Sequence, residues 1–475
     1  MPERSVSILY ACLIGFFLLG LLGCTRLGPD YQRPDIGVKI PTSFENTAGA
    51  TELGKLHFRL RWEELFPSLG LEKIISELRN RNLDIKVAVQ RVIQARLQLK
   101  QVGAEHYPQV NLNVEAQREQ RPITGIFPGG SFSTKTDSFV LSGAASYELD
   151  LWGRLARGTE AALAQVLEAE ENRRTVELTV EAEVVSRCVK MAIIKRRISI
   201  AQQLIANQTK TLSTVQRRYK RGLASLMEVR KAKSALARAR AAVPSLREEM
   251  ARTGQELSFL LGHYPRLRLV REIGPEYLDL IGEVPEGLPS RLLERRPDVR
   301  AAEHKLQVLN ARIGVAHANR FPHITLTGTY GYTSTDLEVL IGPGSKLWSI
   351  AAGLIQPLFN AGKLKAAEEA AVARYNQGVA EYAKTVLNAF LEVEKALVTR
   401  KEQLERRKMV LEYLREARAA EELAQRRYGR GLTDYLSLLD SQRVRFNAED
   451  SLALVDLAIL TNRVALIRAL GGSWN

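Results

Sequence analysis

The stretch QRRYKRGL, Gln216 to Leu223, returns 209 positions later as QRRYGRGL, Gln425 to Leu432, with seven of its eight residues unchanged. Clustered Lys and Arg suit a helix carboxyl end, where the helix dipole favours cations. The glycine that follows can adopt the left-handed backbone that ends a helix, and Ser225 with Glu228 has capping-box spacing for a returning helix. The stretch therefore predicts a turn between two helices. Its repetition predicts that the chain contains two such helical hairpins.

The repetition extends well beyond these turns. GRLARGTEAALA from Gly153 matches GKLKAAEEAAVA from Gly362 at the same offset, and upstream YPQVNL matches FPHITL at an offset of 214. We interpret residues 71–265 and 290–475 as two copies of one unit, joined by a linker at 266–289. The period is too long for a solenoid, so this is a tandem duplication.

Each copy contains two stretches in which apolar and polar residues alternate with the period of a β-strand. They cover about 109–118 and 138–152 in the first copy, joined by the Gly/Pro-rich PITGIFPGGSFSTKTD, and about 323–332 and 347–359 in the second. A transmembrane barrel requires strands of this kind, whereas in a soluble sandwich the apolar face would be core. Four strands cannot close a barrel, since the smallest have about eight. If the strands face lipid, several chains must pool them, and three chains would give twelve.

Long segments without glycine or proline follow the strands. Between Gly158 and Gly222 lie 63 such residues, and between Gly378 and Gly429 lie 50. The first predicts a helix about 95 Å long at 1.5 Å per residue. Its two adjoining apolar stripes indicate packing against a neighbour on each side, as in a ring of coiled coils. One stripe contains Val176, Val180, Val184, Cys188 and Met191, and the other contains Val185, Val189, Ala192, Ile193 and Ile200.

The first 24 residues predict export. The apolar run from Ile8 to Gly23 is short for a membrane helix and suits a secretory signal, so residues 1–23 are interpreted as a signal peptide. LLGC, which ends at Cys24, resembles the bacterial lipobox. That resemblance implies cleavage before Cys24 and acylation of the new amino terminus, and Thr25 in place of aspartate implies release to the outer membrane. Residues 24–70 would then form a lipidated amino-terminal segment, with a plain signal and an incidental cysteine as the alternative.

The composition narrows the classes of function. The 68 Lys and Arg residues exceed the 53 Asp and Glu, for a net charge of +15, but they are interleaved with acids at helical spacing and form no nucleic-acid-binding module. The three cysteines have neither metal-ligand spacing nor the pattern of a disulfide framework, and Cys188 is interpreted as a small core residue. No H-E-x-x-H, phosphate loop or nucleophile elbow is present. We therefore expect no enzymatic activity, no cofactor and no bound metal.

Several motifs, in the same order, cover nearly the whole chain: LLGCTRLGPDYQRP, YELDLWGR, GLPSRLLERRPDVRAAEHKL, RFPHITLTGTYG, QPLFNAGKL and RYGRGLTDYLSLLDSQR. They resemble the outer-membrane efflux proteins of the TolC family, in its NodT/OprM-type lipoprotein branch. The resemblance implies a mixed, mainly α fold, in which a duplicated helix-hairpin-helix unit forms a trimeric 12-stranded outer-membrane β-barrel continued by a long α-helical periplasmic tunnel.

The resemblance also implies a function and partners. The homotrimer would be the lipid-anchored, barrel-spanning outer-membrane channel of a tripartite efflux system and would extend into the periplasm. An inner-membrane pump of the RND type would feed it through a periplasmic adaptor protein. The alternative from another class is a lipid-anchored periplasmic coiled-coil structural or adaptor protein without a pore.

Site residues follow from the resemblance one position at a time. Asp440 matches a ring of carboxylates at the closed periplasmic gate, and Leu436 lies four residues earlier on the same helix face. Tyr428 and Glu228 match positions that link neighbouring hairpins in the closed state, so Tyr428→Phe is expected to loosen the tip. Packing is the alternative role for Tyr428, and capping is the alternative for Glu228.

Two further expectations concern the acidity of the gate and the contact with the adaptor. Ser437 stands where some relatives carry another acid, which makes the expected gate less acidic. The turns contacted by adaptor tips match Gly222, Leu223, Gly431 and Leu432.

Overall fold

The computed structural model describes residues 26–37, 44, 62–124, 131–266 and 295–472. Cys24, the signal peptide at 1–23 and most of the linker at 266–289 lie outside the described residues. The chain divides into two compact units, and each takes segments from both copies of the predicted repeat. The first unit comprises Met1–Ile36, Arg91–Glu170 and Ala301–Ala383, and the second comprises Gly37–Gln90, Glu171–Arg300 and Lys384–Asn475.

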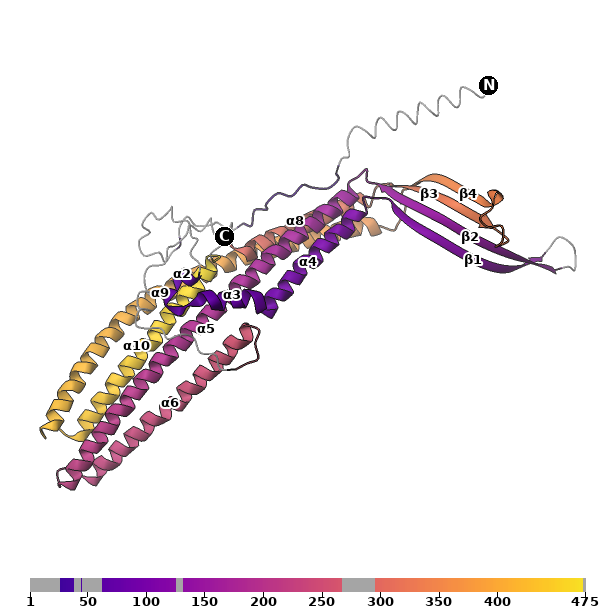
Figure 1. Cartoon of the computed structure of the whole chain (residues 1–475). Coiled ribbons are helices and arrows are strands. Elements are labelled where there is room, and N and C mark those ends of the chain that lie inside the picture. The colour runs from indigo at the N-terminus through magenta and orange to yellow at the C-terminus, as the bar shows by residue number, and fades with distance from the viewer. Residues whose placement is uncertain (1–25, 38–43, 45–61, 125–130, 267–294, 473–475) are drawn as a thin grey trace. The chain divides into compact units, whose positions relative to one another are not determined.

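The first unit contains one antiparallel sheet in the order β1-β2-β3-β4, seen in Figure 1 as four adjacent arrows. Its strands are β1 (Gln109–Thr124), β2 (Ser131–Leu149), β3 (His323–Ser334) and β4 (Lys346–Ile355), with the 3-10 turn η3 (Pro343–Ser345) before β4. The two predicted hairpins, one from each copy of the repeat, therefore lie side by side. Their neighbouring strands, β2 and β3, pair with each other along eleven residue pairs from Phe139↔Ser334 to Leu149↔Ile324.

The register of the sheet gathers the apolar residues on one face. The pairs Val110↔Ala145, Ala145↔Gly328 and Gly328↔Ile350 run across all four strands. Directly paired residues point to the same side of a sheet, so the alternation predicted for each strand adds up to one continuous apolar face. That face is exposed in the single chain, with Leu112, Trp348 and Ile350 at 74%, 71% and 84%.

The strand ends differ from the sequence prediction at both hairpins. β1 and β2 continue into the Gly/Pro-rich stretch that was expected to be only a connection. β1 can include Pro122 because it is an edge strand and can lack a backbone donor. β4 ends at Ile355, short of the predicted residue 359, because its partner β3 begins at His323 and offers no residue to pair beyond that point.

Four long helices form two hairpins, each with its two helices on either side of a tight turn. They are α5 (Arg154–Lys220) with α6 (Leu226–Leu260), and α9 (Lys363–Gly429) with α10 (Tyr435–Ala469). The 67 residues each of α5 and α9 correspond to about 100 Å of helix. Both helices run through glycines that had suggested later starts. At Gly378 a Cβ atom would lie 2.6 Å from the Leu309 side chain, so the glycine allows close packing against a neighbouring helix.

Shorter helices complete the two units: α2 (Trp62–Leu65), η1 (Pro67–Leu69), α3 (Leu71–Arg81), α4 (Leu83–Ala104) and α8 (Pro297–Ala318). Within the described ranges, no helix combines the length and apolar character needed to cross a membrane.

The core of the second unit confirms the two stripes predicted on α5. Val184 and Cys188 of one stripe and Val185 of the other are fully buried. They belong to one hydrophobic cluster with residues of α3, α6 and α10, for example Leu78, Leu257 and Leu460. Figure 1 shows α5 with α6 along one side and α10 along the other. A helix with two apolar stripes therefore packs against neighbours on both sides, as the sequence pattern indicated.

Candidate gate at the paired helical turns

The repeated stretch forms the turn that its sequence predicted, in both copies. Gly222 and Gly431 each have φ of 75°, in the left-handed region. The amide of Leu223 donates to the carbonyl of Arg218, and that of Leu432 donates to that of Arg427, both at 2.9 Å. These bonds satisfy carbonyls at the helix end, as in a Schellman motif.

The returning helices are capped by different residues of matching position. Ser225 accepts a hydrogen bond from the amide of Glu228 at 3.2 Å, and Asp434 accepts one from the amide of Ser437 at 3.0 Å. The hydrogen bonds from Ser437 hold the pKa of Asp434 below its usual value. The capping-box spacing thus gives a real cap, in which the backbone amide of Glu228 donates the hydrogen bond to Ser225.

The two tips differ in packing although their sequences repeat. Tyr219 in the first turn is 44% exposed, whereas its counterpart Tyr428 in the second is 4% exposed. Tyr435, which opens α10, is fully buried, and its ring lies edge-on to that of Tyr428 with centroids 6.0 Å apart. Both tyrosines belong to a small hydrophobic cluster at the tip with Val215, Val229, Ala232 and Leu438. The second turn is therefore packed against the first hairpin.

Arg218 is the residue that joins the two turns. Its Nη1 donates to the carbonyl oxygen of Tyr428 at 3.0 Å, and its guanidinium carbon lies 4.9 Å from the centre of the Tyr428 ring. The repeat places Arg427 at the equivalent position of the second copy, where the side chain is exposed. Arg218 could not be singled out from the sequence, because its stretch and that of Arg427 are nearly identical and give no sign of which copy makes the contact.

The hydroxyl groups of the two tip tyrosines are buried without a hydrogen-bond partner in the described part of the chain. Burial, with smaller contributions from nearby Tyr428 and Glu228, raises the pKa of Tyr435 to about 12. The pKa of Tyr428 is also raised, mainly by burial. Nearby Arg218 lowers this pKa and Glu228 raises it, but neither effect is as large as that of burial. Glu228 is thus close enough to influence both tyrosines, but the Tyr428 hydroxyl makes no hydrogen bond with any described residue of its own chain.

Asp440 and Leu436 lie on one face of α10, as their spacing predicted. Both are exposed, and both line a groove of about 670 Å³ that is formed by α5, α6 and α10. Asp440 accepts a hydrogen bond from Arg443 at 2.5 Å, so its carboxylate is partly neutralised within its own helix.

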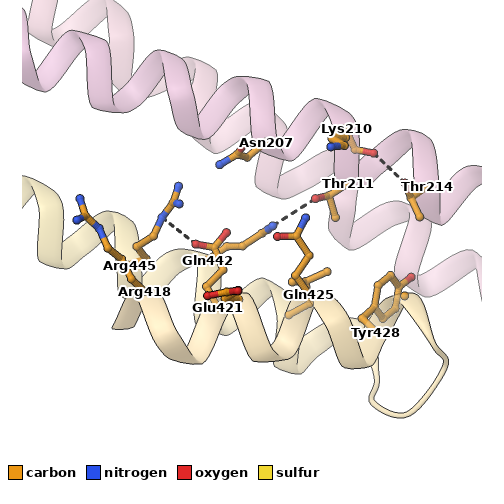
Figure 2. A pocket seen from close by; sticks show the side chains of 13 residues that line it. Asn207, Lys210, Thr211, Thr214, Arg418, Glu421, Gln425, Tyr428, Gln442 and Arg445 are labelled. Carbon is orange, nitrogen blue, oxygen red and sulfur yellow. Dashed lines mark hydrogen bonds and ion pairs between the residues drawn. The ribbon is translucent and has the colours of Figure 1, made fainter. Parts of the chain in front are cut away.

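A second, more polar pocket of about 570 Å³ lies between α5 and the α9–α10 hairpin (Figure 2). Gln442 donates to Thr211 at 3.3 Å and accepts from Gln208 at 3.1 Å, which joins α10 to α5. Arg445 forms an ion pair with Glu421 at 2.8 Å. Burial nevertheless keeps the pKa of the Glu421 carboxyl above its usual value, although Arg445 lowers it. This polar layer lies next to the tyrosine cluster, since Tyr428 and Leu438 line the same pocket.

The remaining predicted residues divide between the tips and the undescribed terminus. Leu223 and Leu432 expose apolar side chains at the two turns, next to Gly222 and Gly431. Cys24, the predicted lipidation site, lies outside the described residues. No group of three or more His, Cys, Asp or Glu side chains that could hold a metal ion occurs among the residues that the structure describes.

Strands with an exposed apolar face and two helices of 67 residues are typical of a membrane channel protein with a helical extension. The chain belongs to the outer membrane efflux protein family, whose sequence model matches residues 74–263 and 288–472.

Curated relatives and solved structures agree with this assignment. The cation efflux system protein CusC of Escherichia coli O6:H1 is 30% identical over 457 residues, which cover 96% of this chain and 97% of the relative. The probable efflux pump outer membrane protein TtgC of Pseudomonas putida is 32% identical over 467 residues, 96% of this chain and 94% of the relative. The open-state structure of the Neisseria gonorrhoeae outer membrane channel MtrE is 27% identical, with a TM-score of 0.81 and coverage of 94% and 98%.

The protein is thus an outer-membrane efflux channel of the TolC type that extends into the periplasm, and it is a component of a tripartite system with an adaptor and an inner-membrane pump. These relatives are channel and efflux proteins, not enzymes.

Proposed function

We propose that three copies of this chain pool their strands into one twelve-stranded barrel and bring their helical turns together as a periplasmic gate. The observation that carries this proposal is the sheet itself. It has one continuous exposed apolar face, and its outer strands β1 and β4 each have one unpaired edge among the described residues. Unpaired edges cannot remain open in lipid, and four strands are too few to close on themselves.

The gate combines an apolar and an acidic ring. Leu436 and Asp440 lie one helical turn apart on the same face of α10, so three copies around an axis would stack them as two rings. The acidic ring raises the local cation concentration, and the apolar ring narrows the wet cross-section.

Tyr428 and Glu228 hold this gate closed through contacts between hairpins. The Tyr428 hydroxyl has no hydrogen-bond partner within the described part of its own chain, and a buried hydroxyl without a partner costs about 1–3 kcal/mol. A small rearrangement of the tip that brings this hydroxyl to a partner on the neighbouring copy would remove that cost in the closed trimer only.

The outer contacts of the channel complete the proposal. Acyl chains on Cys24 anchor the mature amino terminus in the outer membrane. The exposed turns at Gly222, Leu223, Gly431 and Leu432 receive the tips of a periplasmic adaptor, which connects the channel to an inner-membrane pump of the RND type.

Single-channel recording in planar bilayers tests this function directly. Purified protein should produce discrete conductance steps, because only a continuous pore passes ions. A lipid-anchored adaptor without a pore would give none, and protein that binds the bilayer but never conducts would overturn the proposal.

A further inference from the structure

The groove beside Asp440 is lined by more cationic than anionic side chains. Lys231 and Arg238 of α6 line it together with Arg443 and Asp440 of α10. Asp440 pairs with Arg443, while Lys231 and Arg238 form no ion pair within 4.0 Å among the described residues. Two cationic side chains therefore face the groove without a bonded carboxylate.

The two copies of the repeat carry side chains of opposite charge at the same repeat position. At the offset of 209, Lys231 is the counterpart of Asp440, and both line the same groove. Lys231 and Arg238 are seven residues apart on α6, about 10 Å along the helix. They form a basic edge facing α10.

Half of the residues that line the groove are apolar, and they come from α5, α6 and α10: Leu204, Ala235, Ala239, Ala242, Leu436, Leu439 and Phe446. The volume of about 670 Å³ falls in the range of about 300–1,000 Å³ typical of small-molecule sites. Apolar side chains beside two cations that form no ion pair within 4.0 Å among the described residues fit a ligand that has an apolar body and one anionic group.

We propose that this groove binds amphiphilic organic anions, with a carboxylate or sulfonate on Lys231 and Arg238 and an aromatic or aliphatic body against Leu439 and Phe446. The proposal deepens the proposed function and rests on it for the passage of such anions through the gate. The binding itself requires only the groove. A small ligand is favoured over an acidic protein segment because the basic edge has only two side chains.

The test is block of single-channel current by 1-naphthalenesulfonate, with methanesulfonate and (1-naphthylmethyl)trimethylammonium as probes that each lack one half of its chemistry. We expect block by the naphthalenesulfonate alone. The double variant Lys231→Gln, Arg238→Gln should raise its half-blocking concentration by about tenfold or more, because charge-assisted contacts are lost. Asp440→Asn should lower it, because Arg443 is then released from its carboxylate.

The matched control is Lys233→Gln, Arg240→Gln. These residues lie on the same helix with the same seven-residue spacing, are exposed and do not line the groove. The control should leave the half-blocking concentration within about twofold of wild type, since screened charges outside the site contribute little. Equal effects of the two double variants would overturn the proposal, and so would equal block by methanesulfonate or by polyglutamate.

Calorimetric titration of the intact protein in a non-ionic detergent separates this inference from the proposed function. Naphthalenesulfonate binding that depends on Lys231 and Arg238 supports the groove even if no channel is recorded. A conducting channel whose protein shows no such binding overturns the groove and leaves the channel function standing.

Discussion

Arg218 of the first hairpin donates a hydrogen bond to the carbonyl oxygen of Tyr428 in the second, at 3.0 Å, and its guanidinium carbon lies 4.9 Å from the centre of the Tyr428 ring. Residues 210 positions apart are thus joined at the two repeated turns. One hydrogen bond and one cation–π contact connect the tip of α9 to the end of α5. The stability of the second turn therefore depends on a side chain from the first.

Removing the Arg218 side chain should loosen the second turn. We expect Arg218→Ala to lower the local free energy of opening at residues 425–432 by about 1–3 kcal/mol, from the lost hydrogen bond and cation–π contact. Amide hydrogen exchange of the intact protein measures this opening. Arg427→Ala is the matched control, because Arg427 is the repeat counterpart and is exposed; equal loss of protection in both variants would show that Arg218 has no special role.

The buried tyrosine pair should make the tip sensitive to strongly alkaline pH. Burial, together with nearby Tyr428 and Glu228, raises the pKa of Tyr435 from its ordinary value of 10.0 to about 12, so the folded tip favours the protonated phenol. Its stabilisation is complete below pH 10 and is lost as pH rises through about 12. Ultraviolet titration should show tyrosine ionisation well above pH 10, and Tyr435→Phe should reduce the amplitude of ionisation near pH 12. A wild-type titration in which every tyrosine ionises near pH 10 would contradict it.

Local sequence patterns predicted which helices and strands form better than they predicted the residues at which each one begins and ends. The repeated QRRY stretch, the alternating strands and the two stripes of α5 each follow from spacing alone, and the structure contains all of them. The strand ends could not be predicted, because pairing with a partner strand extended β1 through Pro122 and stopped β4 at Ile355. Neighbouring strands supply or withhold hydrogen bonds whatever the local residues prefer.

The same limit applies to the candidate site. Leu436 and Asp440 could be placed on one face of one helix, since that requires only helical geometry. The partners of the site residues could not, because Arg218 and Arg427 stand in nearly identical sequences and only Arg218 meets a tyrosine. The basic residues that share a groove with Asp440 were also missed, since they lie on α6, about 200 residues away in the sequence.

Acylation of Cys24 should define the mature amino terminus. Replacing the thiol removes the atom that carries the first acyl chain, so Cys24→Ala should leave unprocessed precursor and abolish labelling by a fatty-acid analogue. Gel mobility and metabolic labelling measure the two effects. Cys12→Ala, within the signal peptide, is the control and should leave both unchanged; labelling that survives Cys24→Ala would exclude the lipobox.

Assembly should be trimeric in detergent and in membranes. The described residues of each chain contribute four strands, and twelve are needed for the barrel proposed here. Native mass spectrometry of the purified protein should show a trimer as the main species. A stable, folded monomer as the main species in non-ionic detergent would contradict pooled strands.

Asp440 should set the cation preference of the periplasmic gate. Three carboxylates near one axis attract cations, and Leu436 beside them limits the wet cross-section. Each Asp440 is paired with Arg443 and faces a groove with Lys231 and Arg238, so the ring is only partly uncompensated. Asp440→Asn should therefore weaken cation selectivity, while Arg443→Gln should strengthen it by freeing the carboxylate. Reversal potentials in a salt gradient measure both changes, with Glu402→Gln on the exposed surface of α9 as the control for a single lost charge. If the reversal potential is the same for wild type and Asp440→Asn, Asp440 does not form the gate ring, and the narrowest part of the channel must be lined by other residues.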